Sequence, residues 1–153
     1  MNPASRRTRN HGFTLIEIMA VVLIIGMLSS IVGFAVFRQV DKARVVTAKA
    51  QIDRLESALE LYAMDNGRFP TTEQGLDALV NEPSSAPEPP NYQPGGYLKG
   101  DLPLDPWGNE FLYESPGSHN PGSFDLWSLG KDGVTGGEEL DADIGNWSHE
   151  RSD

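Results

Sequence analysis

The sequence predicts an α+β fold in which one long N-terminal helix leads into a small head that carries an antiparallel sheet. Residues 18–37 contain no charged side chain and are predominantly apolar. No proline occurs in residues 13–64, so a single helix can continue well past the apolar run. Two short aromatic-rich runs, at residues 110–115 and 124–129, flank the turn-forming string PGSHNPGS, and this order is typical of a β-hairpin.

The first half of the predicted helix has the composition of a membrane segment. Its uncharged run is close to the ~20 residues that an α-helix needs to cross a hydrocarbon core. One carboxylate, Glu17, stands at the start of the run, and an acidic residue there indicates a function because burying its charge is costly. Arg6, Arg7 and Arg9 precede the run. The positive-inside rule therefore places this leader in the cytoplasm and the head on the other side of the membrane.

The second half of the predicted helix is amphipathic. Apolar residues recur at steps of three and four between charged residues, and they are Ile52, Leu55, Leu59 and Tyr62. We expect this stripe to pack into the core of the head. The pair Asn66 and Gly67, followed closely by Pro70, predicts the end of the helix.

A second, shorter helix is predicted directly after this end. Thr71 and Gln74 have the spacing of a capping box, which predicts a helix that continues to about Val80. Residues 81–100 are rich in proline, glycine and serine, so we expect an extended surface loop there.

Length, charge and cysteine content limit the possible functions. The 153 residues leave room for one small globular domain after the leader and the apolar run. The formal charge is −10, and without the three leader arginines nine basic and 22 acidic residues remain, a charge of −13. Such an acidic chain lacks the basic surface that nucleic-acid binding needs, and it suits cations or basic partners. The absence of cysteine excludes disulfides, so a metal ion or oligomerisation is expected to stabilise the small head.

Two ordinary interpretations of the chain are disfavoured. A secretory signal peptide would end in a small-residue cleavage site, but after Gly33 and Ala35 the helical pattern simply continues. An enzyme would need a recognisable reactive group, and the sequence contains no cysteine nucleophile, no GxSxG motif and no phosphate-binding loop. We therefore expect no catalytic activity.

The string GFTLIE, residues 12–17, resembles the processing signal of type IV pilins and type II secretion pseudopilins. In that superfamily a prepilin peptidase cuts after the glycine, the new N-terminal phenylalanine is methylated, and the glutamate pairs with the N-terminus of a neighbouring subunit. The resemblance implies cleavage between Gly12 and Phe13 and an assembly role for Glu17.

Four further strings make the resemblance more specific: FPTTEQGLDALV, DPWGNEFLYESPG, DLWSLGKDG and DADIGNW. In this order they are similar to the major pseudopilins of type II secretion systems, over residues 12–147. The implied organisation is a cleaved leader at residues 1–12, a transmembrane and assembly helix at 13–37 and a periplasmic domain at 38–153. One departure is Phe34, which stands where such pseudopilins usually have a proline.

The segment LGKDGVTGGEELDADIGNW is rich in acids and glycines, the composition of a loop that can supply calcium with hard oxygen ligands. It lacks the spacing of an EF-hand, and by composition alone a solvated loop is the commoner interpretation. The resemblance favours a site for one Ca²⁺ instead. It implies Asp132, Asp143 and the carbonyl of Leu129 as ligands, with Asp141 as a neighbour and Glu138 as a weaker one.

The resemblance implies a structural subunit of the type II secretion pseudopilus, anchored by a single pass in a bacterial inner membrane with its C-terminal domain in the periplasm. Its implied partners are further copies of itself, minor pseudopilins, the prepilin peptidase and the inner-membrane secretion platform. Two alternatives stay open: a type IV pilus subunit for adhesion or motility, and a membrane-anchored calcium-binding module that does not polymerise.

Overall fold

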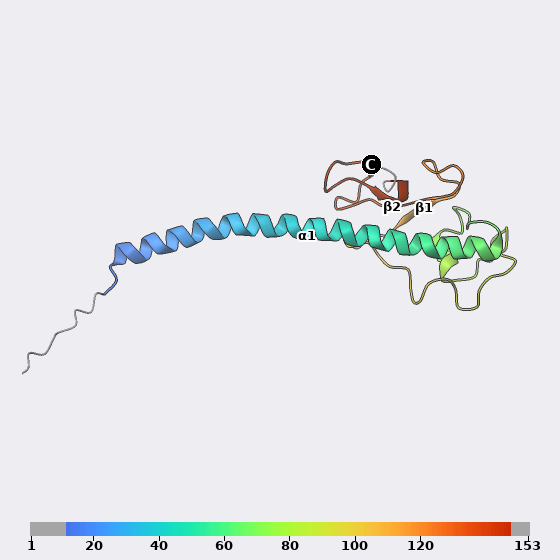
Figure 1. Cartoon of the computed structure of the whole chain (residues 1–153), viewed down its shortest axis with the longest axis horizontal. Coiled ribbons are helices and arrows are strands. Elements are labelled where there is room, and N and C mark those ends of the chain that lie inside the picture. The colour runs from blue at the N-terminus through green and yellow to red at the C-terminus, as the bar shows by residue number, and fades with distance from the viewer. Residues whose placement is uncertain (1–11, 148–153) are drawn as a thin grey trace, which may run out of the picture. The chain divides into compact units, whose positions relative to one another are not determined.

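The computed structural model describes residues 12–147, apart from the side chains of residues 31–37. All of the expected leader except Gly12 therefore lies outside the described residues. The elements follow the order α1 (Leu15–Asn66), a 3₁₀ helix η1 (Leu76–Leu79), β1 (Leu112–Glu114), β2 (Asp125–Ser128) and β3 (Ile144–Gly145), as Figure 1 shows. The chain divides into two compact units, Met1–Gln39 and Val40–Asp153.

Helix α1 is 52 residues long and is continuous through Gly33 and Phe34, where the usual proline is missing. In the described part of the chain, no helix combines the length and the apolar character needed to cross a membrane. The expected span of residues 13–37 includes residues 31–37, whose side chains are not described.

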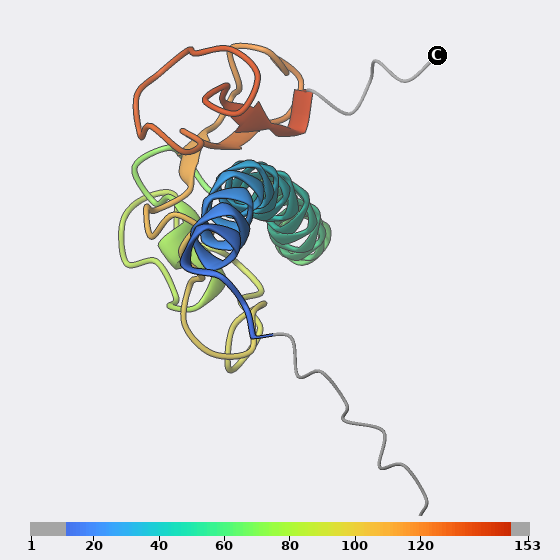
Figure 2. The same ribbon diagram turned by 90° about the vertical axis from the view of Figure 1, so that its left-hand side faces the viewer.

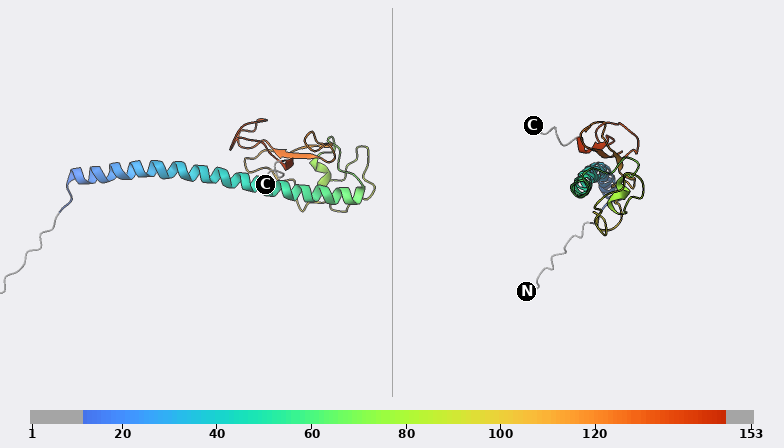
Figure 3. Two further views of the ribbon diagram at one scale, coloured as in Figure 1. Left: turned by 45° about the horizontal axis from the view of Figure 1, so that its top comes forward. Right: turned by 90° about the vertical axis from the view of Figure 1, so that its right-hand side faces the viewer.

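The C-terminal half of α1 supplies the centre of the head's core, as the apolar stripe predicted. The four stripe residues are at most 1% exposed: Ile52, Leu55, Leu59 and Tyr62. Two alanines, Ala48 and Ala58, lie on the same buried face and allow neighbouring segments to approach the helix closely. Figure 2 and the right-hand view of Figure 3 look along α1 and show the sheet and the loops curving around one side of this half of the helix.

The helix ends where the sequence predicted. Gly67 has a φ of 74°, the left-handed conformation that a glycine adopts without steric cost, and its amide donates to the carbonyl of Ala63. The side-chain amide of Asn66 donates to the carbonyl of Tyr62 over 2.9 Å. This carbonyl in the last turn of the helix therefore has a side-chain hydrogen-bond partner.

The second helix differs from the prediction. The capping box exists, because the Gln74 amide donates to Thr71 Oγ1 over 3.2 Å and the Thr71 amide donates to Gln74 Oε1 over 3.0 Å. Only a four-residue 3₁₀ helix follows, however, and it begins after Gly75, which has φ 59° and ψ −163°. That backbone conformation interrupts any α-helix begun at Thr71, so the expected helix up to Val80 is wrong in type and length.

The predicted hairpin is confirmed, and the structure adds a third strand to it. β1 pairs antiparallel with β2, with Tyr113 opposite Leu126, and β2 pairs antiparallel with β3, with Ser128 opposite Ile144. β2 is therefore the central strand, and Leu126 from it is fully buried in the core. The sheet brings the segment after β2 and the segment before β3 together, and these are the two limbs of the acidic loop.

Candidate assembly and cation sites

The processing and assembly residues implied by the sequence lie together at the start of α1. Gly12 and Phe13 precede the helix, and the Phe13 side chain is 77% exposed. A side chain at Gly12 would meet no atom within 4 Å. The described part of the chain therefore leaves Gly12 uncrowded.

Glu17 forms a capping box with Thr14. The Glu17 amide donates to Thr14 Oγ1 over 3.3 Å, and the Thr14 amide lies 3.5 Å from Glu17 Oε2. In a single chain the carboxylate therefore faces the positive, N-terminal end of its own helix.

A buried carboxylate fixes the start of the acidic loop, which we define as residues 129–143 and call the cation loop. Asp105, from the DPWGN string, accepts hydrogen bonds at Oδ1 from the amides of Trp107 (3.0 Å) and Asn109 (2.8 Å). Its Oδ2 accepts from the hydroxyl of Ser128 over 2.6 Å, and that hydroxyl oxygen accepts from the amide of Gly130 over 3.1 Å. This chain of contacts sets the backbone on either side of Leu129, whose carbonyl is an expected calcium ligand.

Backbone contacts shape the rest of the cation loop. The amide of Val134 donates to Asp132 Oδ1 over 3.1 Å, and the amide of Gly136 donates to Asp143 Oδ2 over 3.0 Å. The amide of Asp143 returns a bond to the carbonyl of Gly136 over 3.0 Å, which closes the loop upon itself. Gly130 has a φ of 69°, and a Cβ there would lie 2.8 Å from the carbonyl oxygen of Ala142, so only glycine fits at this crossing.

Among the buried side-chain polar atoms of the described residues, one in the cation loop has no hydrogen-bond partner. Oδ1 of Asp143 is buried and accepts no hydrogen bond. A buried carboxylate oxygen without a donor is unfavourable unless a cation or another donor reaches it. Asp143 also lines a cavity of about 190 Å³, whose other walls include His119, Asp125 and Trp147, but the remaining expected ligands do not line it. A carboxylate oxygen is a hard ligand of the kind that Ca²⁺ prefers, so this one oxygen is compatible with the ion that the resemblance implies.

The structure does not gather the expected carboxylates into one cluster. Among the described residues, no group of three or more His, Asp or Glu side chains could hold a metal ion by itself. Asp132, Glu138 and Asp141 are all exposed, and the Asp141 amide donates to the Glu138 carbonyl over 3.1 Å. Carbonyls and water would have to complete the coordination of any ion bound there.

An ion pair that the sequence reasoning missed joins the cation loop to α1. Lys131 Nζ lies 2.8 Å from Asp41 Oδ2, and Arg44 Nη1 lies 3.9 Å from the other carboxylate oxygen of Asp41. The hydrogen bond to Asp41, and then the negative charge of that carboxylate, raise the pKa of the Lys131 ammonium. The partners are 90 residues apart in the chain, so no local pattern indicates the pair.

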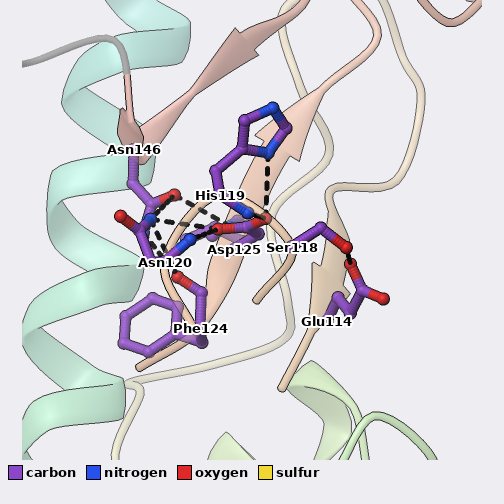
Figure 4. A network of polar contacts seen from close by, with 8 residues as sticks. Glu114, Ser118, His119, Asn120, Phe124, Asp125 and Asn146 are labelled. Atoms are coloured by element: carbon purple, nitrogen blue, oxygen red, sulfur yellow. Dashed lines mark hydrogen bonds and ion pairs between the residues drawn. The ribbon is translucent and has the colours of Figure 1, made fainter. Parts of the chain in front are cut away.

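A second buried carboxylate, Asp125, organises the turn between β1 and β2 (Figure 4). The amide and Nδ1 of His119 lie 2.7 and 3.0 Å from Asp125 Oδ2, and the amide and side chain of Asn120 each donate to Oδ1 over 3.0 Å. Burial favours the neutral acid and would raise the pKa of Asp125, but the hydrogen bonds from His119 and Asn120 outweigh it and lower the pKa. The imidazole of His119 also stacks on the indole of Trp147, with ring centroids 3.9 Å apart.

Comparisons with known proteins identify the family to which the chain is similar. The family described as "Type II secretion system (T2SS), protein G" matches residues 35–147, and the "Prokaryotic N-terminal methylation motif" matches residues 7–33. The chain is 49% identical over 144 residues to the type II secretion system core protein G of Pseudomonas aeruginosa, covering 94% of this chain and 99% of the relative. It is 50% identical over 137 residues to the protein of that name from Vibrio cholerae, covering 90% and 91%.

A solved structure supports the fold. The crystal structure of the major pseudopilin from the type 2 secretion system of enterohaemorrhagic Escherichia coli matches with a TM-score of 0.64 and 44% identity. The match covers 73% of this chain and 93% of that one. The expected pilin-like α+β fold is therefore confirmed.

Proposed function

Since the chain belongs to the type II secretion system protein G family, we propose that its copies stack through their N-terminal helices into a pseudopilus that drives folded proteins across the outer membrane. One observation carries the proposal. Every large apolar side chain described between residues 13 and 28 is at least 47% exposed in the single chain. An apolar surface of that extent needs lipid before assembly and neighbouring copies after it.

Processing would prepare the helix for stacking. Cleavage between Gly12 and Phe13 by a prepilin peptidase, followed by methylation, would leave a charged amine at Phe13, four residues before Glu17. The amine of one subunit would then pair with the Glu17 carboxylate of a neighbour. Each charge alone is unfavourable in an apolar environment, and the pair compensates both at once. It would therefore favour subunits that are added in register.

Residues 13–37 would anchor the unassembled subunit in the inner membrane as a single span, with residues 38–153 in the periplasm. The basic residues before the span and the acidic head after it support this orientation. The secretion platform and minor pseudopilins would receive the subunit at the membrane, and a cytoplasmic ATPase would supply the energy for extraction.

We also propose that the cation loop binds one Ca²⁺ through Asp132, Asp143 and the carbonyl of Leu129, with Asp141 close by. The unpartnered Oδ1 of Asp143 supports this assignment. The ion would supply positive charge between carboxylates that otherwise repel each other, and so would hold the two limbs of the loop together. Isothermal titration calorimetry of the full-length chain in detergent tests whether Ca²⁺ binds and with what stoichiometry.

Replacement of Glu17 tests the filament. We expect Glu17→Ala to insert into membranes normally, because it removes a charge from an apolar segment, but to lose filaments and secretion. Crosslinking in membranes measures filament formation, and an assay of exported protein measures secretion. Glu60→Ala, on the exposed face of α1 within the head, is the control and should assemble. Wild-type assembly by Glu17→Ala would refute the charge pair, and absence of any crosslinked ladder in the wild type would favour the non-polymerising module.

A further inference from the structure

Lys131 occupies an unusual place for a cation. It lies within the cation loop, two residues after Leu129 and directly before Asp132, both of which are expected calcium ligands. A lysine ammonium placed among the loop carboxylates would neutralise them and so compete with a bound ion. The position of its side chain therefore bears on calcium affinity.

The structure shows Lys131 paired outside the loop. The loop contains five carboxylates, of Asp132, Glu138, Glu139, Asp141 and Asp143. Among the described residues none of these five carboxylates is ion-paired with Lys131, although the negative charge of Asp141, after the hydrogen bond and charge of Asp41, helps to raise the pKa of Lys131. The Nζ of Lys131 lies 2.8 Å from Asp41 Oδ2 on α1. The Asp41 side chain is only 15% exposed, so it offers the ammonium a partner that water reaches poorly.

We infer that Asp41 keeps the ammonium of Lys131 from pairing directly with the carboxylates of the cation loop and thereby leaves them free for a divalent ion. Asp41 is a positioning residue in this arrangement, since it acts on the ion through Lys131. The inference rests on the proposed calcium site. The charges act in the same sense, because a bound Ca²⁺ would repel the Lys131 ammonium while the Asp41 carboxylate attracts it.

A simple structural tether is the competing explanation of the same contact. If the pair only ties the loop to the helix, removal of either partner should weaken calcium binding equally. If Asp41 withdraws a competing cation, the two single variants should behave differently. Removal of Asp41 would release Lys131 toward the loop, whereas removal of Lys131 would remove the competitor.

Calcium titration calorimetry on the full-length chain in detergent, at low ionic strength, separates the two explanations. We expect Asp41→Asn to weaken calcium affinity about two- to fivefold, the scale of a partly exposed ion pair. Lys131→Gln should bind at least as tightly as the wild type, and the double variant should match Lys131→Gln. Added salt should reduce the effect of Asp41→Asn, because screening weakens the interaction of the released lysine with the loop.

The control is Glu60→Gln, which removes one negative charge from another exposed position of α1 and should leave the affinity unchanged. Equal weakening by Asp41→Asn and Lys131→Gln would establish a tether and overturn the inference, as would an unchanged affinity for Asp41→Asn. Absence of calcium binding by the wild type would refute the proposed site itself, and the inference with it.

Discussion

The hydroxyl of Ser128 donates to Oδ2 of Asp105 over 2.6 Å, and both residues are buried, at 0% and 4% exposure. This contact joins the DPWGN turn to the end of β2. Because the same hydroxyl oxygen accepts from the Gly130 amide, the turn also fixes the first residues of the cation loop. One buried carboxylate thus connects the packing of the head to the backbone at the start of the cation loop.

Ser128→Ala should lower the free energy of unfolding by about 1.5–3 kcal/mol, because it removes a hydrogen bond to a buried charged group. Asp105→Asn should also destabilise the head, since the amide that replaces one oxygen cannot accept from the donors around it. Chemical denaturation of the full-length chain in detergent, followed by tryptophan fluorescence, measures both effects. Asp101→Asn, an exposed change four residues away, is the control. Equal stability of Ser128→Ala and the wild type would show that the contact is energetically neutral.

Asp125 should make the stability of the head depend on pH. Its pKa is lower in the folded chain than the ordinary value of 3.8, so near that pH the folded state binds fewer protons than the unfolded state. The stability that Asp125 contributes is therefore present in full above 3.8 and is lost as the pH falls through the folded pKa.

Denaturation at a series of pH values from about 6 to about 2 tests this dependence. The wild type should lose more stability over the range than Asp125→Asn, which should be less stable than the wild type at the upper end. Asp101→Asn again serves as the exposed control and should follow the wild type. Parallel pH curves for the wild type and Asp125→Asn would contradict the assignment.

Sequence patterns predicted those parts of the structure that depend on local periodicity. The stripe from Ile52 to Tyr62 was visible because a helix of 3.6 residues per turn brings it to one face. The capping box at Thr71 was also visible, but the conformation of Gly75 that ends the turn was not. β3 escaped prediction because it has two residues and exists only by pairing with β2.

The candidate sites also contain residues that the sequence revealed and contacts that only the structure shows. Contiguous signals revealed the residues around Gly12 and Glu17 and the acids of the cation loop. The contacts of Asp105 with Ser128 and of Asp41 with Lys131 join residues 23 and 90 positions apart, and their geometry follows only from the packed head. An aspartate in a tight turn such as DPWGN was the one available signal, since such residues often accept backbone hydrogen bonds.

Removal of the leader should require Gly12, and a substitution at Gly12 should not disturb the folded head. We expect the mature protein to begin at Phe13 and to carry a methylated amine, as mass spectrometry of membrane-extracted protein can show. Gly12→Val should retain the leader, and because no atom lies within 4 Å of a Cβ at this position, the head should be unaffected. Gly26→Ala, where an added Cβ also meets no atom within 4 Å, should be processed normally. A mature start near Ala35 would instead indicate an ordinary signal peptide.

Calcium should stabilise the head through the cation loop. A ligand that binds only the folded state stabilises by RT ln(1 + [L]/Kd), about 2.7 kcal/mol at a hundredfold excess over Kd. Chelation should therefore lower the melting temperature of the full-length chain in detergent, and Ca²⁺ should restore it better than Mg²⁺, whose strict octahedral coordination suits a carbonyl-containing loop poorly. Asp132→Asn and Asp143→Asn should abolish the response to calcium, while Glu60→Gln should keep it. Differential scanning calorimetry that shows the same melting temperature with calcium and with chelator would mean that the cation loop is a solvated acidic loop.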